Sequence, residues 1–195
     1  MPLYRLYDKQ LVHIHIPKTG GTSVTKAVET RGGLASFMRK APAEQCGNVT
    51  PQHMDIGHTK MFFDLGQLPA FAVIRDPWHR TVSEYVWRTS RINWKDMNIF
   101  VKQHLINIDH QKQDNHFLPQ CEFINEDVKL FKYSNTLDDV AEYVGEQLGL
   151  DDFRIKTREQ RRSIYDPPKM RVLDGETRQI WETMYADDLE LYHSL

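Results

Sequence analysis

The sequence predicts an α/β fold with a small central parallel sheet flanked by helices. Short apolar runs typical of buried strands occur at residues 11–16, 71–74 and 128–133, and each is followed by a segment with helical character. Strands that alternate with helices in this way favour a parallel sheet covered on its faces by helices. With 195 residues, of which 40% are hydrophobic, the chain can bury a full core, and we expect one domain over residues 1–195.

The first predicted strand, residues 11–16, leads through a glycine-containing turn into a predicted helix over residues 23–30. The unpaired N–H groups of a first helical turn, with the positive end of the helix dipole, bind anions such as phosphate or sulfate. Two glycines let the backbone approach a ligand, a lysine adds a positive charge, and three hydroxyls add donors. A plain tight turn is the alternative, but this combination favours an anion site. The predicted anion-binding loop comprises Pro17, Lys18, Thr19, Gly20, Gly21, Thr22 and Ser23.

The second predicted strand, Phe71–Ile74, ends at Arg75-Asp76 and is followed by a predicted helix over residues 78–91. Arg75 then lies at the carboxyl end of its strand, where ligands bind in open α/β sheets. A guanidinium can hold a phosphate through two parallel N–H bonds, and Ser83 on the following helix is within reach of the same place. The alternative for Arg75 is an ion pair with Asp76 or another nearby carboxylate.

The rest of the chain continues the alternation of strand and helix and ends in helix. Ser134-Asn135-Thr136 is a predicted helix cap, and Gly149 is a predicted helix end. In order, the sequence predicts a helical segment at 92–108, a polar loop at 111–120, a strand at 128–133, a helix at 137–148, an irregular stretch at 151–169 and a helix at 175–191.

The two motifs together resemble those of the sulfotransferases that use 3′-phosphoadenosine 5′-phosphosulfate (PAPS), and most closely the carbohydrate branch with the heparan sulfate 2-O- and chondroitin sulfotransferases. In a P-loop the lysine follows the glycines, whereas Lys18 precedes them. The resemblance implies a P-loop-like three-layer fold, PAPS as the donor, the bisphosphate PAP as the product, and no metal. It also implies that residues 17–23 hold the 5′-phosphosulfate and that Arg75 and Ser83 hold the 3′-phosphate. For Arg80 we expect an internal contact with Asp76.

The resemblance also suggests the catalytic groups. Relatives of the carbohydrate branch carry a Gly-His pair where this chain has Gly57-His58, and in the 2-O enzymes the matching histidine is thought to be the base. His58 is therefore the candidate base, and Lys18 would stabilise charge on the leaving phosphate. Those relatives often have a second histidine where this chain has Ile56, and a surface or bracing role is the alternative for His58. His116 lies in a segment similar to a loop near the acceptor pocket of relatives and is a candidate substrate contact.

Two other classes of function stay open. A nucleoside triphosphate-dependent kinase or NTPase would need magnesium ligands, and Arg75 at the strand end disfavours a metal there. A nucleotide- or glycan-binding module without catalysis would keep the loop but lack the base. His, Cys, Asp and Glu do not occur at metal-ligand spacing, so we expect no metal site.

Composition limits the partners. The net charge of −2 gives no general affinity for nucleic acid or membranes, so recognition of an anionic glycan would be local. We expect a carbohydrate or another hydroxyl-bearing acceptor. The start of the chain has no signal peptide or spanning helix, which predicts a cytoplasmic protein of bacterial or viral type, or a catalytic domain trimmed of its anchor. The two cysteines, Cys46 and Cys121, are expected to be free thiols. Two groups of basic residues are candidates for contact with an anionic glycan: Arg88, Arg91 and Lys95, and Lys156, Arg158, Arg161 and Arg162.

Overall fold

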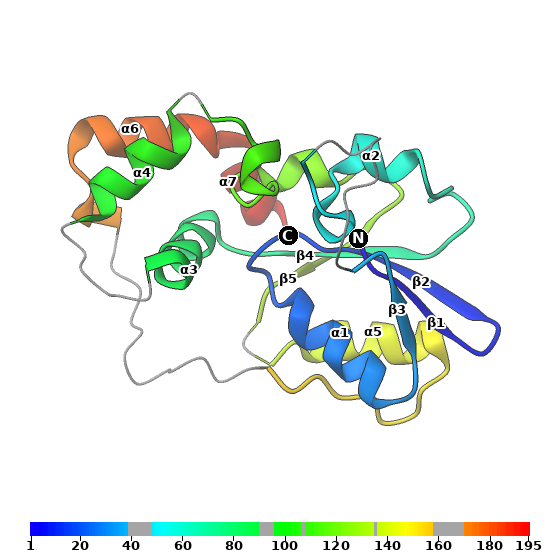
Figure 1. Cartoon of the computed structure of the whole chain (residues 1–195). Helices are drawn as coiled ribbons and strands as arrows, with labels where there is room; N and C mark the ends of the chain where they lie inside the picture. Colours follow the sequence, from blue (N-terminus) through cyan, green and yellow to red (C-terminus); the bar gives the residue numbers. More distant parts are fainter. Residues whose placement is uncertain (39–47, 90–95, 107, 135, 158–169) are drawn as a thin grey trace.

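The computed structural model describes residues 1–38, 48–89, 96–106, 108–134, 136–157 and 170–195. Within them a five-stranded sheet with the order β3-β1-β2-β4-β5 forms the centre of the molecule (Figure 1). The strands are β1 (Leu3–Leu6), β2 (Lys9–Ile14), β3 (Leu34–Ser36), β4 (Ala70–Ile74) and β5 (Lys129–Lys132). The α-helices are α1 (Gly21–Thr30), α2 (Ile56–Lys60), α3 (Pro77–Thr89), α4 (Met97–Leu105), α5 (Asp138–Leu148), α6 (Gly175–Met184) and α7 (Ala186–Ser194).

The sheet is mixed, with a parallel part that carries the predicted motifs. Strands β2, β4 and β5 are parallel neighbours, as the sequence predicts. Strand β1 pairs antiparallel with both β2 and β3, so two antiparallel strands that were not predicted from the sequence extend the central parallel sheet at this edge. The difference arises because a two-residue turn after Leu6 folds β1 back onto β2, with Leu6 opposite Lys9.

Helices cover both faces of the sheet, which confirms the α/β fold (Figure 1). Side chains alternate between the faces along each strand. In β4, Phe71 and Val73 pack with the apolar residues of α1 and α5 on one face. Ala72 and Ile74 pack on the other face with a second core, to which Ile56 of α2 and Leu191 of α7 contribute. The central strand β4 therefore has no solvent-facing side, as expected of a strand buried on both faces, whereas β5 at the edge of the sheet is partly exposed.

A third apolar cluster joins α3, α4 and α6 beside the sheet (Figure 1). Trp181 of α6 is fully buried, packs edge-on against Trp78 of α3 at 5.7 Å between ring centroids, and donates to the Thr81 hydroxyl at 2.9 Å. The single helix predicted over residues 175–191 is in fact two, α6 and α7, which meet at Tyr185. Tyr185 is buried and its hydroxyl donates to the Phe117 carbonyl at 3.0 Å, so tertiary contact fixes the break.

Most other local predictions agree with the structure. Gly149 ends α5 with a φ of 67°, as predicted. The start of α5 differs from the prediction, because its N-cap is Leu137 and no side chain caps the helix, although the Ser134 hydroxyl accepts the Leu137 N–H at 2.9 Å. The predicted polar loop at 111–120 contains a 3₁₀ turn, η4 (Gln111–Gln113), and leads into another, η5 (Gln120–Phe123). Further 3₁₀ turns are η2 (Pro51–His53) and η7 (Met170–Val172).

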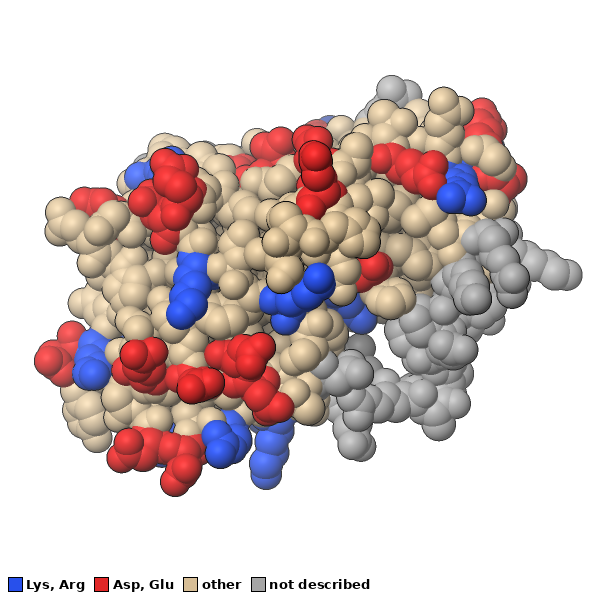
Figure 2. Space-filling model, turned by 180° about the vertical axis from the view of Figure 1, so that it is seen from behind, with Lys and Arg blue, Asp and Glu red and all other residues tan. Residues whose placement is uncertain are grey.

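Several predictions concern residues outside those that the structure describes: Cys46, Arg91, Lys95, Arg158, Arg161 and Arg162. Cys121 is a free thiol, and burial together with the nearby Asp188 carboxylate raises its pKa to about 12. No helix in the described part of the chain is long and apolar enough to cross a membrane. Acidic and basic side chains are interspersed on the face seen in Figure 2, as the nearly balanced composition predicts.

Candidate active site

The predicted anion-binding loop lies between β2 and α1 and leaves the start of the helix open. Lys18 and Gly20 have positive φ angles of 70° and 94°. A Cβ at Gly20 would lie 3.1 Å from the Leu137 side chain, so both conformation and space favour glycine there. No side chain caps α1, and the N–H groups of Gly21 and Thr22 donate to no described residue. The first turn of α1 is therefore available to an anion.

Two loop residues have structural contacts that the sequence did not predict. Gly21 is needed for packing, because a Cβ there would lie 2.1 Å from the imidazole of His15. The buried Thr19 hydroxyl donates to the Ile16 carbonyl at 2.9 Å. Thr19 therefore closes the loop with its side chain, whereas the exposed Thr22 hydroxyl stays open to solvent. Pro17 is buried and Ser23 is half-buried.

Arg75 follows β4 and lies against the loop. Its Nη1 donates to the Lys18 carbonyl at 2.9 Å, and its guanidinium lies 4.6 Å from the centre of the Tyr133 ring. The amide side chain of Gln120 binds both the N–H and the carbonyl of Arg75, at 3.0 and 2.8 Å, and so fixes the end of the strand. The Nε of Arg75 is buried and has no hydrogen-bond partner. Arg75 thus has a donor without a partner among the described residues, and it makes no ion pair with a described carboxylate.

The expected side-chain contact between Arg80 and Asp76 is wrong, and the described bond between the two residues joins their backbones. Asp76 instead accepts the His79 N–H at 2.8 Å, at the start of α3. Arg80 is 3% exposed, and its guanidinium donates to the Pro17 carbonyl at 3.1 Å and to the His116 carbonyl at 2.9 Å. One arginine therefore ties the anion-binding loop to the segment that contains His116.

The Lys18 ammonium lies 5.0 Å from the centre of the Trp87 ring and makes no hydrogen bond or ion pair with the residues that the structure describes. Burial lowers the pKa of Lys18 to about 8, against the opposing charge of Glu84 and with the help of Arg75 and Arg88. Lys18, Arg75 and Arg80 thus gather at one loop without a described carboxylate partner. Such an arrangement attracts an anionic ligand.

The surroundings of Ser83 and His58 indicate less about a ligand than those of Lys18 and Arg75. Ser83 is a half-buried residue of α3 whose hydroxyl has no described partner. His58 lies on α2, where its Nδ1 is 2.7 Å from Asp55 Oδ2 and its N–H donates to Asp55 Oδ1 at 2.9 Å. Asp55 caps α2 and holds the His58 ring, so the bracing alternative for His58 has a structural basis. A role as base stays a prediction.

His116 packs beside two residues of α3, Glu84 and Trp87. Its Nδ1 is 2.9 Å from Glu84 Oε2, and its ring stacks on Trp87 with centroids 5.2 Å apart. Glu84 is 1% exposed, and its other carboxylate oxygen accepts Arg88 Nε at 2.6 Å. Burial opposes ionisation of Glu84, but the hydrogen bonds from His116 and Arg88 lower the pKa of this carboxyl below its ordinary value.

A row of buried histidines runs from the sheet to His116, and sequence reasoning missed it. The rings of His13 and His15 lie 5.4 Å apart, those of His15 and His53 5.1 Å, and those of His53 and His116 4.9 Å. Burial lowers the pKa of His13 to about 3 and that of His53 to about 4. The alternation of His13 and His15 along one strand was visible in the sequence, but the partners of His15 come from distant segments.

Two of these histidines and a nearby aspartate, Asp114, have a metal-compatible geometry that sequence spacing did not indicate. Ligand atoms of His53, Asp114 and His116 lie within 4.8 Å of one another. The Asp114 carboxylate already accepts three hydrogen bonds without a metal. Its donors are the Thr50 N–H, the Thr50 hydroxyl and His53 Nδ1, at 2.7, 3.0 and 2.8 Å. The Asp114 carboxylate therefore serves to hold His53 and the residue 50 turn in place.

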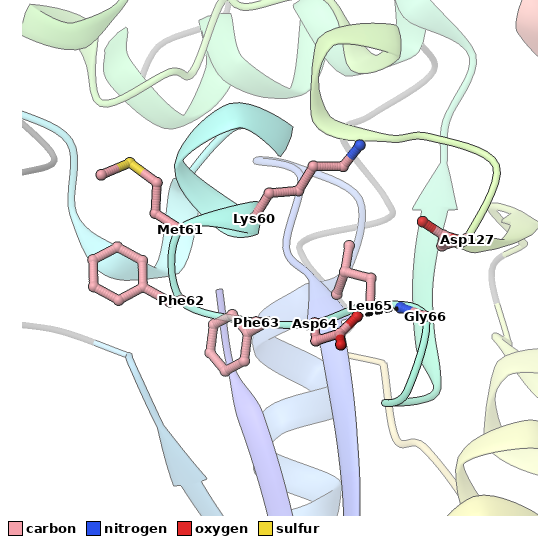
Figure 3. Close-up of a pocket in the computed structure, with 8 residues that line it drawn as sticks. All are labelled: Lys60, Met61, Phe62, Phe63, Asp64, Leu65, Gly66 and Asp127. Atoms are coloured by element: carbon pink, nitrogen blue, oxygen red, sulfur yellow. Dashed lines mark hydrogen bonds between the residues drawn. The ribbon is translucent and has the colours of Figure 1, made fainter.

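Two open cavities lie away from this loop. One, of about 470 Å³, is lined by residues 60–66 and Asp127, and Figure 3 shows the side chains of Phe62, Phe63 and Asp127 around it. The other, of about 740 Å³, is lined by residues of α5 and the segment that follows it. Neither is lined by a site residue predicted from the sequence.

Comparison with known proteins gives one match. Residues 4–193 match the family described as the sulfotransferase family, which covers both motifs and the segment around His116. No curated protein and no solved structure matches the chain.

Proposed function

Since the chain belongs to the sulfotransferase family, we propose that it transfers the sulfuryl group from PAPS to a hydroxyl group, most naturally that of a carbohydrate. The observation that carries this proposal is the gathering of Lys18, Arg75 and Arg80 at the open start of α1 without a described carboxylate partner. A donor with anionic groups at both its 5′ and 3′ positions would neutralise these charges.

The residues present fit such a donor. The N–H groups of Gly21 and Thr22 and the Lys18 ammonium would hold the 5′-phosphosulfate. The buried, unpartnered Nε of Arg75 would donate to the 3′-phosphate, together with the Ser83 hydroxyl. A buried donor without a partner is unfavourable, so a phosphate at Arg75 would remove a cost that the free protein bears.

The bound donor would supply an activated sulfuryl group on a phosphate leaving group. The chain's own task is to hold that phosphate in place and to stabilise the negative charge that develops on it, and Lys18 and the loop N–H groups suit this task. We propose that transfer needs no metal ion, because these positive groups neutralise the leaving group. The acceptor hydroxyl must lose its proton to a basic side chain, and His58 is the candidate that the family resemblance suggests.

Calorimetry distinguishes this proposal from a nucleotide kinase or NTPase. We expect PAP to bind without magnesium and ATP with magnesium not to bind. Arg75 occupies the strand end where a kinase would place an acidic magnesium ligand, so the opposite result would reject a sulfotransferase site. Arg75→Met should weaken PAP binding by about tenfold or more, since a charge-assisted hydrogen bond contributes about 1.5–3 kcal/mol.

Activity distinguishes an enzyme from a binding module that lacks catalysis. Radiolabelled PAPS offered with polysaccharides, glycolipids and small alcohols would reveal the acceptor class. Transfer to a sugar hydroxyl supports the full proposal. PAP binding without transfer to any acceptor would instead indicate a nucleotide-binding module.

A further inference from the structure

His116 and the anion-binding loop are held together by a single side chain. The buried guanidinium of Arg80 binds the carbonyl of Pro17, at the start of the loop, and the carbonyl of His116 itself. Both bonds are about 3 Å long, so the two backbone segments lie on either side of one guanidinium. Any ligand that rests on the loop therefore lies near the segment that carries His116.

The side chains converge as well as the backbones. The indole of Trp87 has the Lys18 ammonium 5.0 Å from its centre and the His116 ring stacked at 5.2 Å. The lysine that would face the leaving phosphate and an imidazole thus share one aromatic platform. No described contact joins His58 to Lys18 or to Trp87, and the described polar partner of His58 is Asp55.

Glu84 determines which nitrogen of His116 is free. An ionised carboxylate only accepts hydrogen bonds, so the proton of neutral His116 resides on Nδ1, which lies 2.9 Å from Glu84 Oε2. The other imidazole nitrogen, Nε2, then carries the lone pair. Arg88 holds the second oxygen of Glu84, which fixes the carboxylate and with it the orientation of the ring. The side chain of His116 is 11% exposed, so it is sheltered but accessible.

We propose that His116, rather than His58, removes the proton from the acceptor hydroxyl and that Glu84 positions it. This inference rests on the proposed sulfuryl transfer. The proton moves from the acceptor oxygen to His116 Nε2 while that oxygen forms its bond to sulfur. The bond between sulfur and the phosphate oxygen breaks, and its electron pair remains on the phosphate. Glu84 keeps its hydrogen bond to Nδ1 and stabilises the imidazolium that forms.

Single variants of the two histidines test the assignment. His116→Ala should lower kcat by about 10²–10⁴-fold, the range typical of a lost general base, while the Kd for PAP changes less than about threefold. His79→Ala is the matched control, because its imidazole is about half exposed at the start of α3, and it should keep kcat within about threefold. His58→Ala should lower kcat by much less than His116→Ala does. The reverse pattern would overturn the inference. Failure of the wild-type protein to bind PAP would instead reject the proposed function, so the two failures are distinguishable.

Glu84→Gln provides a test that does not depend on removing the ring. Glutamine can still accept the Nδ1 hydrogen bond but has no charge, so the imidazolium loses its stabilising neighbour. The acid limb of the pH profile of kcat should move to lower pH by roughly one unit, with KM for the acceptor nearly unchanged. An acid limb identical to that of the wild type would overturn the inference, because a purely structural Glu84 would not set it.

The other charged and titratable groups around His116 stay the same in this variant. They are His15, Lys18, His53, Arg80, Arg88 and Asp114. Thermal melting of each variant, with and without PAP, checks that it remains folded. A His116→Ala protein that does not fold leaves the Glu84→Gln profile to decide.

Discussion

Replacing Gly21 with alanine tests the packing beneath the anion-binding loop. An alanine Cβ would lie 2.1 Å from Cδ2 and 2.2 Å from Nε2 of the His15 ring, whereas ordinary contact begins at 3.4 Å. The ring would have to move by roughly 1 Å. It cannot do so freely, because His15 is 6% exposed and lies between the rings of His13 and His53. Overpacking of this kind costs about 1–3 kcal/mol, and alanine regains about 0.5–1 kcal/mol of helix propensity.

The expected net loss for Gly21→Ala is therefore about 1–2 kcal/mol in the free energy of unfolding, or roughly 2–8 °C in Tm. Gly175→Ala is the matched control, because Gly175 also begins a ten-residue helix but has nothing within 4 Å of its Cβ position. Gly175→Ala should be neutral or stabilising by about 0.5–1 kcal/mol. In the Gly21→Ala background, His15→Ala should cost about 1–2 kcal/mol less than in the wild type. Equal effects of the two glycine variants in urea denaturation would refute the contact with His15.

Three further outcomes follow from the same surroundings. Arg80→Lys should lower the free energy of unfolding by about 1.5–3 kcal/mol in urea denaturation, because a lysine cannot bind two carbonyls in fork geometry. The control, Arg178→Lys on an exposed helix face, should change the free energy of unfolding by less than about 0.5 kcal/mol. The free energy of unfolding should fall as pH decreases from about 6.5 toward 4, by up to roughly 1.4 kcal/mol per pH unit for each of His13 and His53. Burial lowers the folded pKa values of these histidines to about 3 and about 4, so the unfolded chain takes up protons first. Constant stability between pH 7 and 5 would contradict this prediction. PAP affinity measured by calorimetry should decrease as pH rises through about 8, where burial lets Lys18 lose its proton, and Lys18→Arg should remove that dependence.

Local chemistry predicted the parts of the site that lie next to one another in the chain. The order of strand, glycine turn and helix located the loop at residues 17–23, and the run that ends in Arg75 located the second motif. Both follow from hydrophobic periodicity and from the backbone freedom of glycine, which act over a few residues. The same rules placed α5 and its end at Gly149, because a left-handed glycine at a helix end is also a local signal.

The contacts of residues 114–120 could not be predicted in this way. Asp114 and Asn115 bind groups in residues 50–53, Phe117 accepts a bond from Tyr185, and Gln120 binds Arg75. These partners are separated by 45 to 68 residues in sequence, and periodicity carries no information over such distances. The expected link between Arg80 and Asp76 was wrong for the same reason. Asp76 is a carboxylate close to Arg80 in the sequence, whereas the carbonyls that Arg80 binds, those of Pro17 and His116, are distant in the chain.

Arg75 and Arg80 have the same side chain but different tasks, because they lie on either side of the junction between β4 and α3. Arg80 lies inside the first turns of α3, where its Nε and Nη2 donate to the Pro17 and His116 carbonyls. Arg75 lies at the strand end, where its Nε has no partner. Neither charge is neutralised by a described carboxylate, so both raise the positive potential at the loop, and Arg75 also has a buried donor without a described partner. In the proposed donor site, the buried Arg80 would therefore act through its charge and through the loop geometry that it fixes, which gives a reason for an arginine where a neutral donor could satisfy two carbonyls.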